Sequence, residues 1–221
     1  MKKRIILYKK GFRYELALEE GKTATVSNQE TAQLTLASQE NPLHFQWSQG
    51  EIFYQYGEDK GVLENSKILG DVVCYLATGE VHTYELLDKE EILVADEEGA
   101  DLRVHYPVRF LLVKKEQTWT CQLLSGKLYH NHKLVSEATF PLAFGDELAI
   151  GDVTFKLYPE EFGVEGSVEV SPYLVPRLHS RYDFYKDYPE YHRSPRIIYR
   201  SSEDKILINP PRAEPQKPSD E

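Results

Sequence analysis

The residues of this chain whose types and spacing could do chemistry include two neighbouring histidines, His130 and His132. Residues two apart on a β-strand point to the same side, so both imidazoles could face one metal ion. Two histidines are too few for a structural metal site, which takes four ligands. The spacing therefore predicts no metal site.

Four pairs of adjacent acids could be the carboxylate pairs of a glycosidase. They are Glu19 and Glu20, Glu90 and Glu91, Glu97 and Glu98, and Glu160 and Glu161. Adjacent carboxylates in turns usually face water, and acid–base catalysis needs a pocket that the sequence does not indicate. His44 has no adjacent Ser or Cys that could act as a nucleophile. We therefore predict no catalytic residue.

A phosphate-binding loop for a nucleotide is also missing from the sequence. Gly126-Lys127 is a partial match, but the loop requires Gly-x-x-x-x-Gly-Lys-Ser/Thr. Cys121 and Leu128 occupy the outer positions of that pattern. The sequence thus predicts no cofactor and no enzymatic activity in this chain.

The amino-acid composition favours β-sheets and a protein partner. The 221 residues include 15 Tyr and 9 Phe but a single Met, a balance that suits pleated, half-buried surfaces. The formal net charge of −10 argues against a nucleic-acid partner, because phosphate binding depends on clustered Lys and Arg.

The cysteines and the apolar runs indicate a cytoplasmic location. Cys74 and Cys121 lie far apart in separate apolar stretches, which favours free thiols in a reducing compartment. Met1 to Lys10 contains too short an apolar run for a signal peptide. The longest apolar run, near Val72 to Ala77, is far shorter than the roughly 20 residues that span a bilayer. We expect no direct membrane insertion of these residues.

Short runs rich in Val, Ile, Leu, Tyr and Phe recur along the chain, separated by Gly, Asn, Asp or charged pairs. This pattern is typical of a β-sandwich or barrel. In Phe12 to Leu18, apolar residues alternate with polar ones such as Arg13 and Glu15, which predicts a strand with one buried and one exposed face. No helical apolar stripe precedes residue 165, so the predicted fold class is all-β.

Four landmarks of the first half recur in the same order in the second half. They are Ala32 to Leu36 and Ala100 to Val104, Asn41 to Phe45 and Tyr106 to Phe110, Asn65 to Ile68 and Asn131 to Leu134, and Gly70-Asp71 and Gly145-Asp146. A duplicated domain explains this order better than one large fold. We predict two tandem β-sandwich domains, residues 1–88 and 89–162.

Residues 163–221 differ in character, because eight prolines fall among Tyr, Arg and acidic residues. Prolines at that density block regular strand pairing, so this segment is predicted to be an extended tail with a disordered end. Arg177 to Arg200 has six Lys or Arg against three acids. These cations could pair with acidic faces of the sandwiches, or lie near an anionic membrane leaflet.

The landmarks of both halves resemble the forkhead-associated (FHA) domain. Members of that family carry a Gly-Arg turn, a Ser-x-x-His loop, an Asn-Gly loop and a Gly-Asp turn. The resemblance implies a degenerate phosphothreonine site in each domain, at Asn28, Asn41, His44, Asn65, Asp96, Tyr106, Arg109 and Asn131.

The departures from the family pattern concern the residues that hold the phosphate. Family members that bind phosphothreonine use the Arg of the Gly-Arg turn and the Ser of the Ser-x-x-His loop, both suited to a dianion. Here Asn28 and Asp96 stand at the Arg position, and Asn41 and Tyr106 at the Ser position. Asp96 would repel a phosphate. His44 corresponds to the structural histidine of the family.

The tail carries a second resemblance. Its motif consists of Tyr191, His192, Arg193, Ser194, Pro195 and Arg196, followed by Lys205 to Pro211. It looks like the segment that joins the tandem FHA domains of EssC/YukB-type ATPases to their membrane helices. These are FtsK/SpoIIIE-like motor subunits of type VII (ESX) secretion. The resemblance implies an N-terminal cytosolic region, tethered to the inner face of the membrane, with ATPase domains beyond residue 221.

The resemblance implies a non-catalytic interaction module that docks the motor subunit to other secretion components. By family analogy its partner would be the EssB/YukC-like membrane pseudokinase, and the isolated fragment would be a monomer. The alternative is a phosphothreonine-peptide-binding FHA module, which the missing Arg and Ser disfavour. An unrelated sandwich enzyme is disfavoured by the tail.

Overall fold

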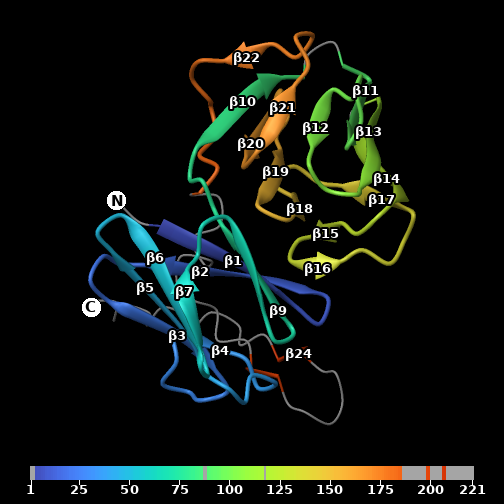
Figure 1. The fold of residues 1–221 in the computed structure, drawn as a ribbon. Helices are drawn as coiled ribbons and strands as arrows, with labels where there is room; N and C mark the ends of the chain where they lie inside the picture. Colours follow the sequence, from blue (N-terminus) through green and yellow to red (C-terminus); the bar gives the residue numbers. More distant parts are fainter. Residues whose placement is uncertain (1–2, 87–88, 117, 186–197, 200–205, 208–221) are drawn as a thin grey trace, which may run out of the picture.

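The computed structural model describes residues 3–86, 89–116, 118–185, 198–199 and 206–207. In these residues all regular structure is β-sheet, which confirms the predicted all-β class. Figure 1 shows two lobes, the first in blue and cyan and the second in green, yellow and orange. The described residues include no helix that is long and apolar enough to cross a membrane.

The first lobe is a sandwich of two layers whose strands are mostly antiparallel. Its strands are β1 (Lys3–Lys9), β2 (Phe12–Leu18), β3 (Thr23–Ser27), β4 (Leu34–Thr35), β5 (Leu43–Ser48), β6 (Glu51–Tyr56), β7 (Asp59–Val62), β8 (Ser66–Leu69) and β9 (Val72–Leu76). One layer runs β2-β1-β9-β8, and the other runs β4-β3-β5-β6-β7, with β3 and β4 parallel. Alternate residues such as Phe45 and Trp47 fill the core between the layers.

The second lobe repeats the two-layer design with more strands. They are β10 (Val81–Glu85), β11 (Glu91–Ala95), β12 (Leu102–Val104), β13 (Arg109–Lys115), β14 (Thr118–Ser125), β15 (Tyr129–His130), β16 (Lys133–Leu134), β17 (Thr139–Leu142), β18 (Glu147–Ile150), β19 (Val153–Leu157), β20 (Glu161–Glu165), β21 (Val168–Val170) and β22 (Pro176–Arg177). One layer runs β22-β10-β20-β19-β18-β15-β16 and the other β17-β14-β13-β11-β12-β21. Phe110 and Phe155 meet edge to face between them, with ring centroids 5.8 Å apart.

The limits of the second core differ from the expected boundaries at 88 and 162. Strand β10 pairs with β20 along its whole length, and Tyr84 and Leu86 belong to the second core. At the other end, Val164 and Leu174 are also buried there. Strand β10 therefore packs in the second lobe, although more than seventy residues of sequence separate it from its partner β20. The short strand β21 (Val168–Val170) also pairs with β12 of the second lobe.

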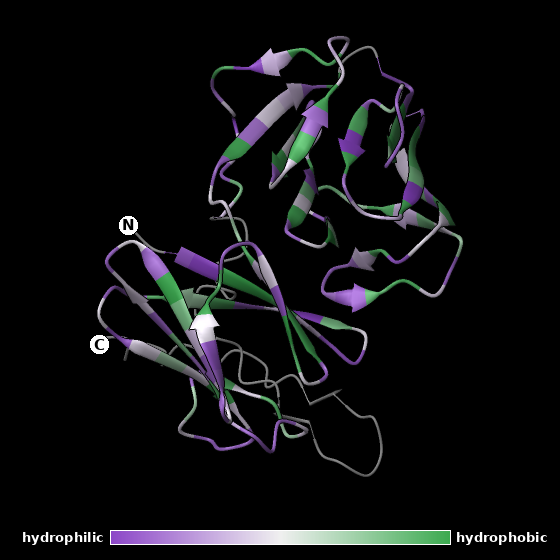
Figure 2. Cartoon of the chain, viewed as in Figure 1, coloured by the Kyte–Doolittle hydropathy of each residue, from purple (hydrophilic) through white to green (hydrophobic). Residues whose placement is uncertain are grey.

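The two lobes are joined through one layer. Lys133 of β16 pairs with Phe12 of β2, which makes an 11-stranded sheet that runs from β22 to β8. Figure 2 shows hydrophobic and hydrophilic residues alternating along the strands, as expected for sheets with one face on a core. Beyond residue 185, only the antiparallel pair β23 (Ile198–Tyr199) and β24 (Ile206–Leu207) is described. The tail motif of residues 191–196 lies outside the described residues.

One predicted strand face is corrected by this arrangement. Strand β2 does alternate, with Tyr14, Leu16 and Leu18 buried in the first core. Its other face was expected to meet water, but Arg13 is 1% exposed. The reason is that the second lobe packs against that face and supplies partners for the charge.

Candidate functional site

The loops around β4 carry two of the degenerate phosphothreonine positions, Asn28 and Asn41, and both residues are exposed. Gln39 holds these loops together: its carbonyl oxygen accepts a hydrogen bond from Asn28 N at 2.9 Å, and its Nε2 donates to Asn41 O at 2.6 Å. The family pattern has an arginine at the position of Asn28. The asparagine found here carries no positive charge.

Lys9 supplies a cation beneath these same loops, which sequence reasoning missed. Its Nζ donates to Gln39 Oε1 at 2.6 Å and to Ser38 O at 3.1 Å, and it forms an ion pair with Asp71 Oδ1 at 2.9 Å. The Lys9 side chain is 3% exposed. Because its donors are used inside the protein, this lysine is not presented to an incoming anion. The predicted Gly-Asp turn at Gly70-Asp71 therefore contributes a structural ion pair.

His44 and Asn65 lie away from those loops. The side chain of His44 is half-buried on β5, and its Nδ1 lies 3.0 Å from Thr25 Oγ1 on β3, directly across the strand pair. This contact fits a structural histidine, although it braces two strands instead of a loop. Asn65 is exposed just before β8, and its carbonyl oxygen accepts a hydrogen bond from Leu76 N at 2.8 Å.

In the second lobe, the position that the family gives to its serine holds a tyrosine turned inward. The Tyr106 hydroxyl donates to Asp152 Oδ1 at 2.7 Å and accepts from Asp152 N at 3.2 Å. Burial raises the pKa of Tyr106 above its ordinary value, and the Asp152 carboxylate raises it further. The ring meets Tyr75 of the first lobe edge to face, at 5.9 Å between centroids. Tyr106 therefore contributes to the contact between the lobes.

The charged positions near it are also paired. Asp96 lies 3.9 Å from Arg103 Nε, and Arg109 Nη1 donates to Glu97 Oε2 at 2.9 Å. Arg109 is a cation at the start of β13, but Glu97 offsets its charge. The side chains of Asp96 and Arg109 are both partly exposed, so these pairs contribute little to stability.

The two histidines that could have shared a metal ion have different partners. His130 Nε2 lies 2.9 Å from Asp146 Oδ2 and its ring stacks on Phe140, whereas His132 Nδ1 lies 3.3 Å from Arg13 Nη1. Burial lowers the pKa of His132. The described residues contain no cluster of three or more His, Cys, Asp or Glu that could hold a metal ion.

Asn131 joins the predicted asparagine loop to the second Gly-Asp turn. Its backbone has φ 45°, a left-handed conformation that Asn tolerates. The side chain donates from Nδ2 to Asp146 Oδ1 at 2.8 Å and accepts at Oδ1 from Glu147 N at 3.0 Å. The asparagine loop and the second Gly-Asp turn are thus hydrogen-bonded to each other, next to the junction with the first lobe.

The junction between the lobes is built around two arginines of the first lobe. Arg13 donates to Glu147 Oε1 at 2.8 Å and Thr154 Oγ1 at 2.9 Å in the second lobe. It also donates to Glu15 Oε1 at 2.7 Å in its own strand. Arg4 bridges Glu15 and the buried Glu165. Burial favours a raised pKa for Glu15, but Arg13 and Arg4 outweigh it and hold the pKa at about 2.

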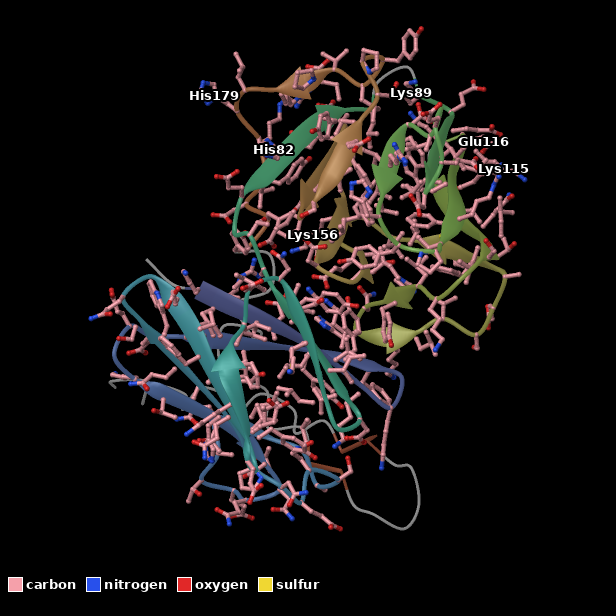
Figure 3. The ribbon with its side chains drawn as sticks, in the orientation of Figure 1. His82, Lys89, Lys115, Glu116, Lys156 and His179 are labelled. Atoms are coloured by element: carbon pink, nitrogen blue, oxygen red, sulfur yellow. The ribbon has the colours of Figure 1, made fainter. Side chains whose placement is uncertain are left out.

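The start of the predicted tail is fastened to the second lobe and to this junction. Arg177 Nη1 donates to the buried Glu161 at 3.2 Å, and Arg181 Nη1 to Glu160 at 2.6 Å. Figure 3 labels Lys156 where the second lobe meets the first, and its Nζ donates to Phe184 O at 2.6 Å. Tyr185 accepts a hydrogen bond from Arg4 at 3.1 Å. For these residues, pairing with the sandwiches is therefore observed, and beyond residue 185 only β23 and β24 are described.

A groove of about 530 Å³ opens at the junction, and both lobes line it. The first lobe contributes Asn65, Ser66 and Tyr75, and the second contributes Tyr106 and His105. Two positions predicted for separate phosphothreonine sites, Asn65 and Tyr106, thus face one groove. The remaining predicted positions do not converge with them.

The two-layer lobes, their paired loops and their repeated Gly-Asp turns define a class of protein, a tandem of FHA-type β-sandwiches. No family model matches the chain. A solved structure described as the N-terminal FHA domain from EssC, a component of the bacterial type VII secretion apparatus, superimposes with a TM-score of 0.68. The match covers 80% of this chain and 98% of that one, at 17% identity. It confirms the FHA fold.

The sequence comparisons agree with this fold. Type VII secretion system protein EssC of Staphylococcus aureus is 27% identical over 227 residues in strain MRSA252, and equally so in strain NCTC 8325. These matches cover 96% of the chain but 15% of each relative. They confirm the resemblance to the N-terminal region of EssC, a part of the type VII secretion apparatus. The chain thus spans about 15% of the length of the curated relatives that it matches.

Proposed function

We propose that this chain is a protein–protein interaction module that docks a type VII secretion ATPase to other secretion components at the cytosolic face of the membrane. Its partner is the cytosolic domain of the EssB/YukC-like pseudokinase. The observation that carries this proposal is the junction of the two lobes. A buried charge cluster fixes them as one body, so their loops and edges form a single extended surface.

The internal use of the phosphate-site positions supports the same conclusion. Tyr106 is hydrogen-bonded to Asp152 and packed on Tyr75. Lys9 is not one of these positions but is the cation beneath the loops of Asn28 and Asn41, and it is held by Gln39 and Asp71. A phosphothreonine reader needs free cationic donors at these positions, because a dianion is expensive to desolvate without them. A module that recognises unmodified protein surfaces has no such requirement.

The test is a binding measurement between the purified 221-residue chain and the cytosolic domain of the pseudokinase from the same organism. We expect saturable binding by biolayer interferometry at physiological ionic strength, unchanged by phosphatase treatment of the pseudokinase. An unrelated FHA domain of similar charge serves as the control. Absence of saturable binding would remove the proposed partner. Binding that disappears after phosphatase treatment would instead support the phosphothreonine-reading alternative.

A further inference from the structure

Among the residues that the structure describes, β8 of the first lobe has a strand edge with no neighbouring strand, and this edge lies beside the groove at the junction. Strand β8 ends the 11-stranded sheet, and Asn65 and Ser66 at its start line the groove. We propose that an extended peptide segment of a protein partner adds to the sheet along β8, with apolar side chains alternating along it and basic residues beside them. This inference rests on the proposed function and names the surface through which the module acts.

The hydrogen-bond register shows which backbone groups of β8 are available. In an antiparallel pair, residues that exchange both hydrogen bonds alternate with residues that do not. Leu76 N donates to Asn65 O, and the register pairs Lys67 with Cys74 and Leu69 with Val72. Asn65, Lys67 and Leu69 therefore point their backbone groups toward β9. Ser66 and Ile68 point their N–H and C=O groups outward, where a partner strand can bind them.

The side chains at this edge favour an apolar partner residue. Ile68 is 67% exposed, and it lies directly across from Val73 on the face that packs against the second lobe. Val73 and Tyr75 are packed against the small cluster of Ile6, Tyr8 and Ala77 at the junction. Ile68 thus extends this apolar cluster to the open edge. A partner side chain lying over Ile68 would bury apolar area that water now covers.

Three of the other edge strands carry a proline or a pair of charged residues. Proteins commonly block exposed edges with proline or charge, because an open edge pairs with other chains. Pro176 stands in β22 at the far end of the same sheet, and Pro141 stands in the edge strand β17. The edge strand β7 begins with the charged pair Asp59 and Lys60. Strand β8 has no proline, and its lysine side chain turns to Asp59 and the Tyr54 ring.

The negative charge near β8 favours a basic partner peptide over a second copy of this chain as the added strand. Glu64 lies two residues before the start of β8, and Glu58 lies in the turn after Tyr56, whose side chain lies close to Gly70 in the β8–β9 turn. Both acids are exposed, and neither has an ion pair among the described residues. The chain as a whole has a formal net charge of −10. A second copy would bring further negative charge, whereas basic residues flanking an apolar strand would be attracted.

The experiment starts from a random library of twelve-residue peptides displayed on phage and selected on the immobilised 221-residue chain. We expect the selected sequences to alternate apolar residues and to contain Lys or Arg. Synthetic versions should bind the chain with Ile68→Pro at least tenfold more weakly, because proline removes an outward N–H that β9 does not use. Ile68→Val keeps that N–H and should change the affinity less than threefold.

A second measurement, amide hydrogen exchange, uses the unmodified chain. Its result therefore does not depend on whether Ile68→Pro folds. The amides of Ser66 and Ile68 should exchange with solvent rapidly in the free chain and become protected when the peptide is bound. Failure to select any peptide, or protection elsewhere without protection of these amides, would overturn the proposal. So would sedimentation showing that the chain itself dimerises and that Ile68→Pro abolishes the dimer.

The same variants separate this inference from the proposed function. If the pseudokinase domain binds and Ile68→Pro has no effect, the β8 surface is wrong while the docking function stands. If the pseudokinase domain does not bind but selected peptides protect Ser66 and Ile68, the proposed partner is wrong and the surface stands.

Discussion

Arg13 Nη1 lies 2.8 Å from Glu147 Oε1, across the junction between the two sandwiches. The arginine side chain is fully buried and the glutamate nearly so. A buried charge without a partner is costly, so each lobe stabilises the other through this contact. The pair explains why two domains that each have their own core are held in one relative orientation.

Replacing Arg13 by Ala should destabilise the chain by about 3 to 5 kcal/mol, because Glu147 would be left buried without its cation and Glu15 would keep only Arg4. We expect calorimetry to show two separate unfolding transitions in place of one. Arg103→Ala is the matched control, since Arg103 also has two acidic partners but is partly exposed. It should cost less than about 1 kcal/mol. Equal losses for the two variants would contradict a structural role for the junction.

The stability of the chain should fall in acid because of Glu15. Its pKa is about 2 in the folded chain, below the ordinary value of 4.5. A lowered carboxyl pKa contributes stability that is fully present above the unfolded value and is lost as pH falls through the folded one. The free energy of unfolding measured with urea should therefore fall between pH 4.5 and 2, and it should fall less steeply in Glu15→Gln. The same change at the exposed Glu30 should leave the pH profile as in the parent chain.

Two glycines with similar backbone conformations should differ in their tolerance of alanine. Gly21 has φ 76° and no atom within 4 Å of an added Cβ, whereas Gly126 has φ 89° and Pro107 O at 2.2 Å. Gly21→Ala should cost about 1 to 2 kcal/mol from conformation alone. Gly126→Ala should cost roughly 1 to 3 kcal/mol more through crowding. Thermal unfolding checks this order, and a lower melting temperature for Gly21→Ala would refute it.

Phosphothreonine peptides should bind no better than their unphosphorylated forms. Asn28, Asn41 and Tyr106 offer no cation at the phosphate-holding positions, and Asp96 would repel the phosphate. Isothermal calorimetry with matched peptide pairs measures the difference. A phosphate-dependent gain of tenfold, about 1.4 kcal/mol, would contradict this expectation.

Both cysteines should react slowly in the folded chain. Burial raises the pKa of Cys74 and of Cys121 to about 12, so little thiolate forms at neutral pH. Labelling with a thiol-specific chromogenic disulfide should be slow in buffer and rapid in concentrated urea. Fast labelling of the native chain would show that one of the two cores opens readily.

The sequence by itself determined the strands and their repetition. Alternation in segments such as Phe12–Leu18 predicts which face meets the core of the same domain, because that core is built from residues nearby in the sequence. The Gly-Asp turns and the residues at the phosphate-site positions are also local, so both could be recognised without a structure. These local features were enough for the fold class and for the resemblance to the FHA family.

Only the tertiary structure decided what the second face of β2 touches. Arg13 and Glu147 are 134 residues apart, and a charged residue that will be buried by another domain has the same local pattern as one that faces water. For the same reason β10 could not be assigned to the second lobe, since its partner β20 lies far along the chain. The use of Tyr106 in the junction and the open edge at β8 likewise follow from how the two lobes pack, because strand periodicity describes one sheet and carries no information on its neighbour.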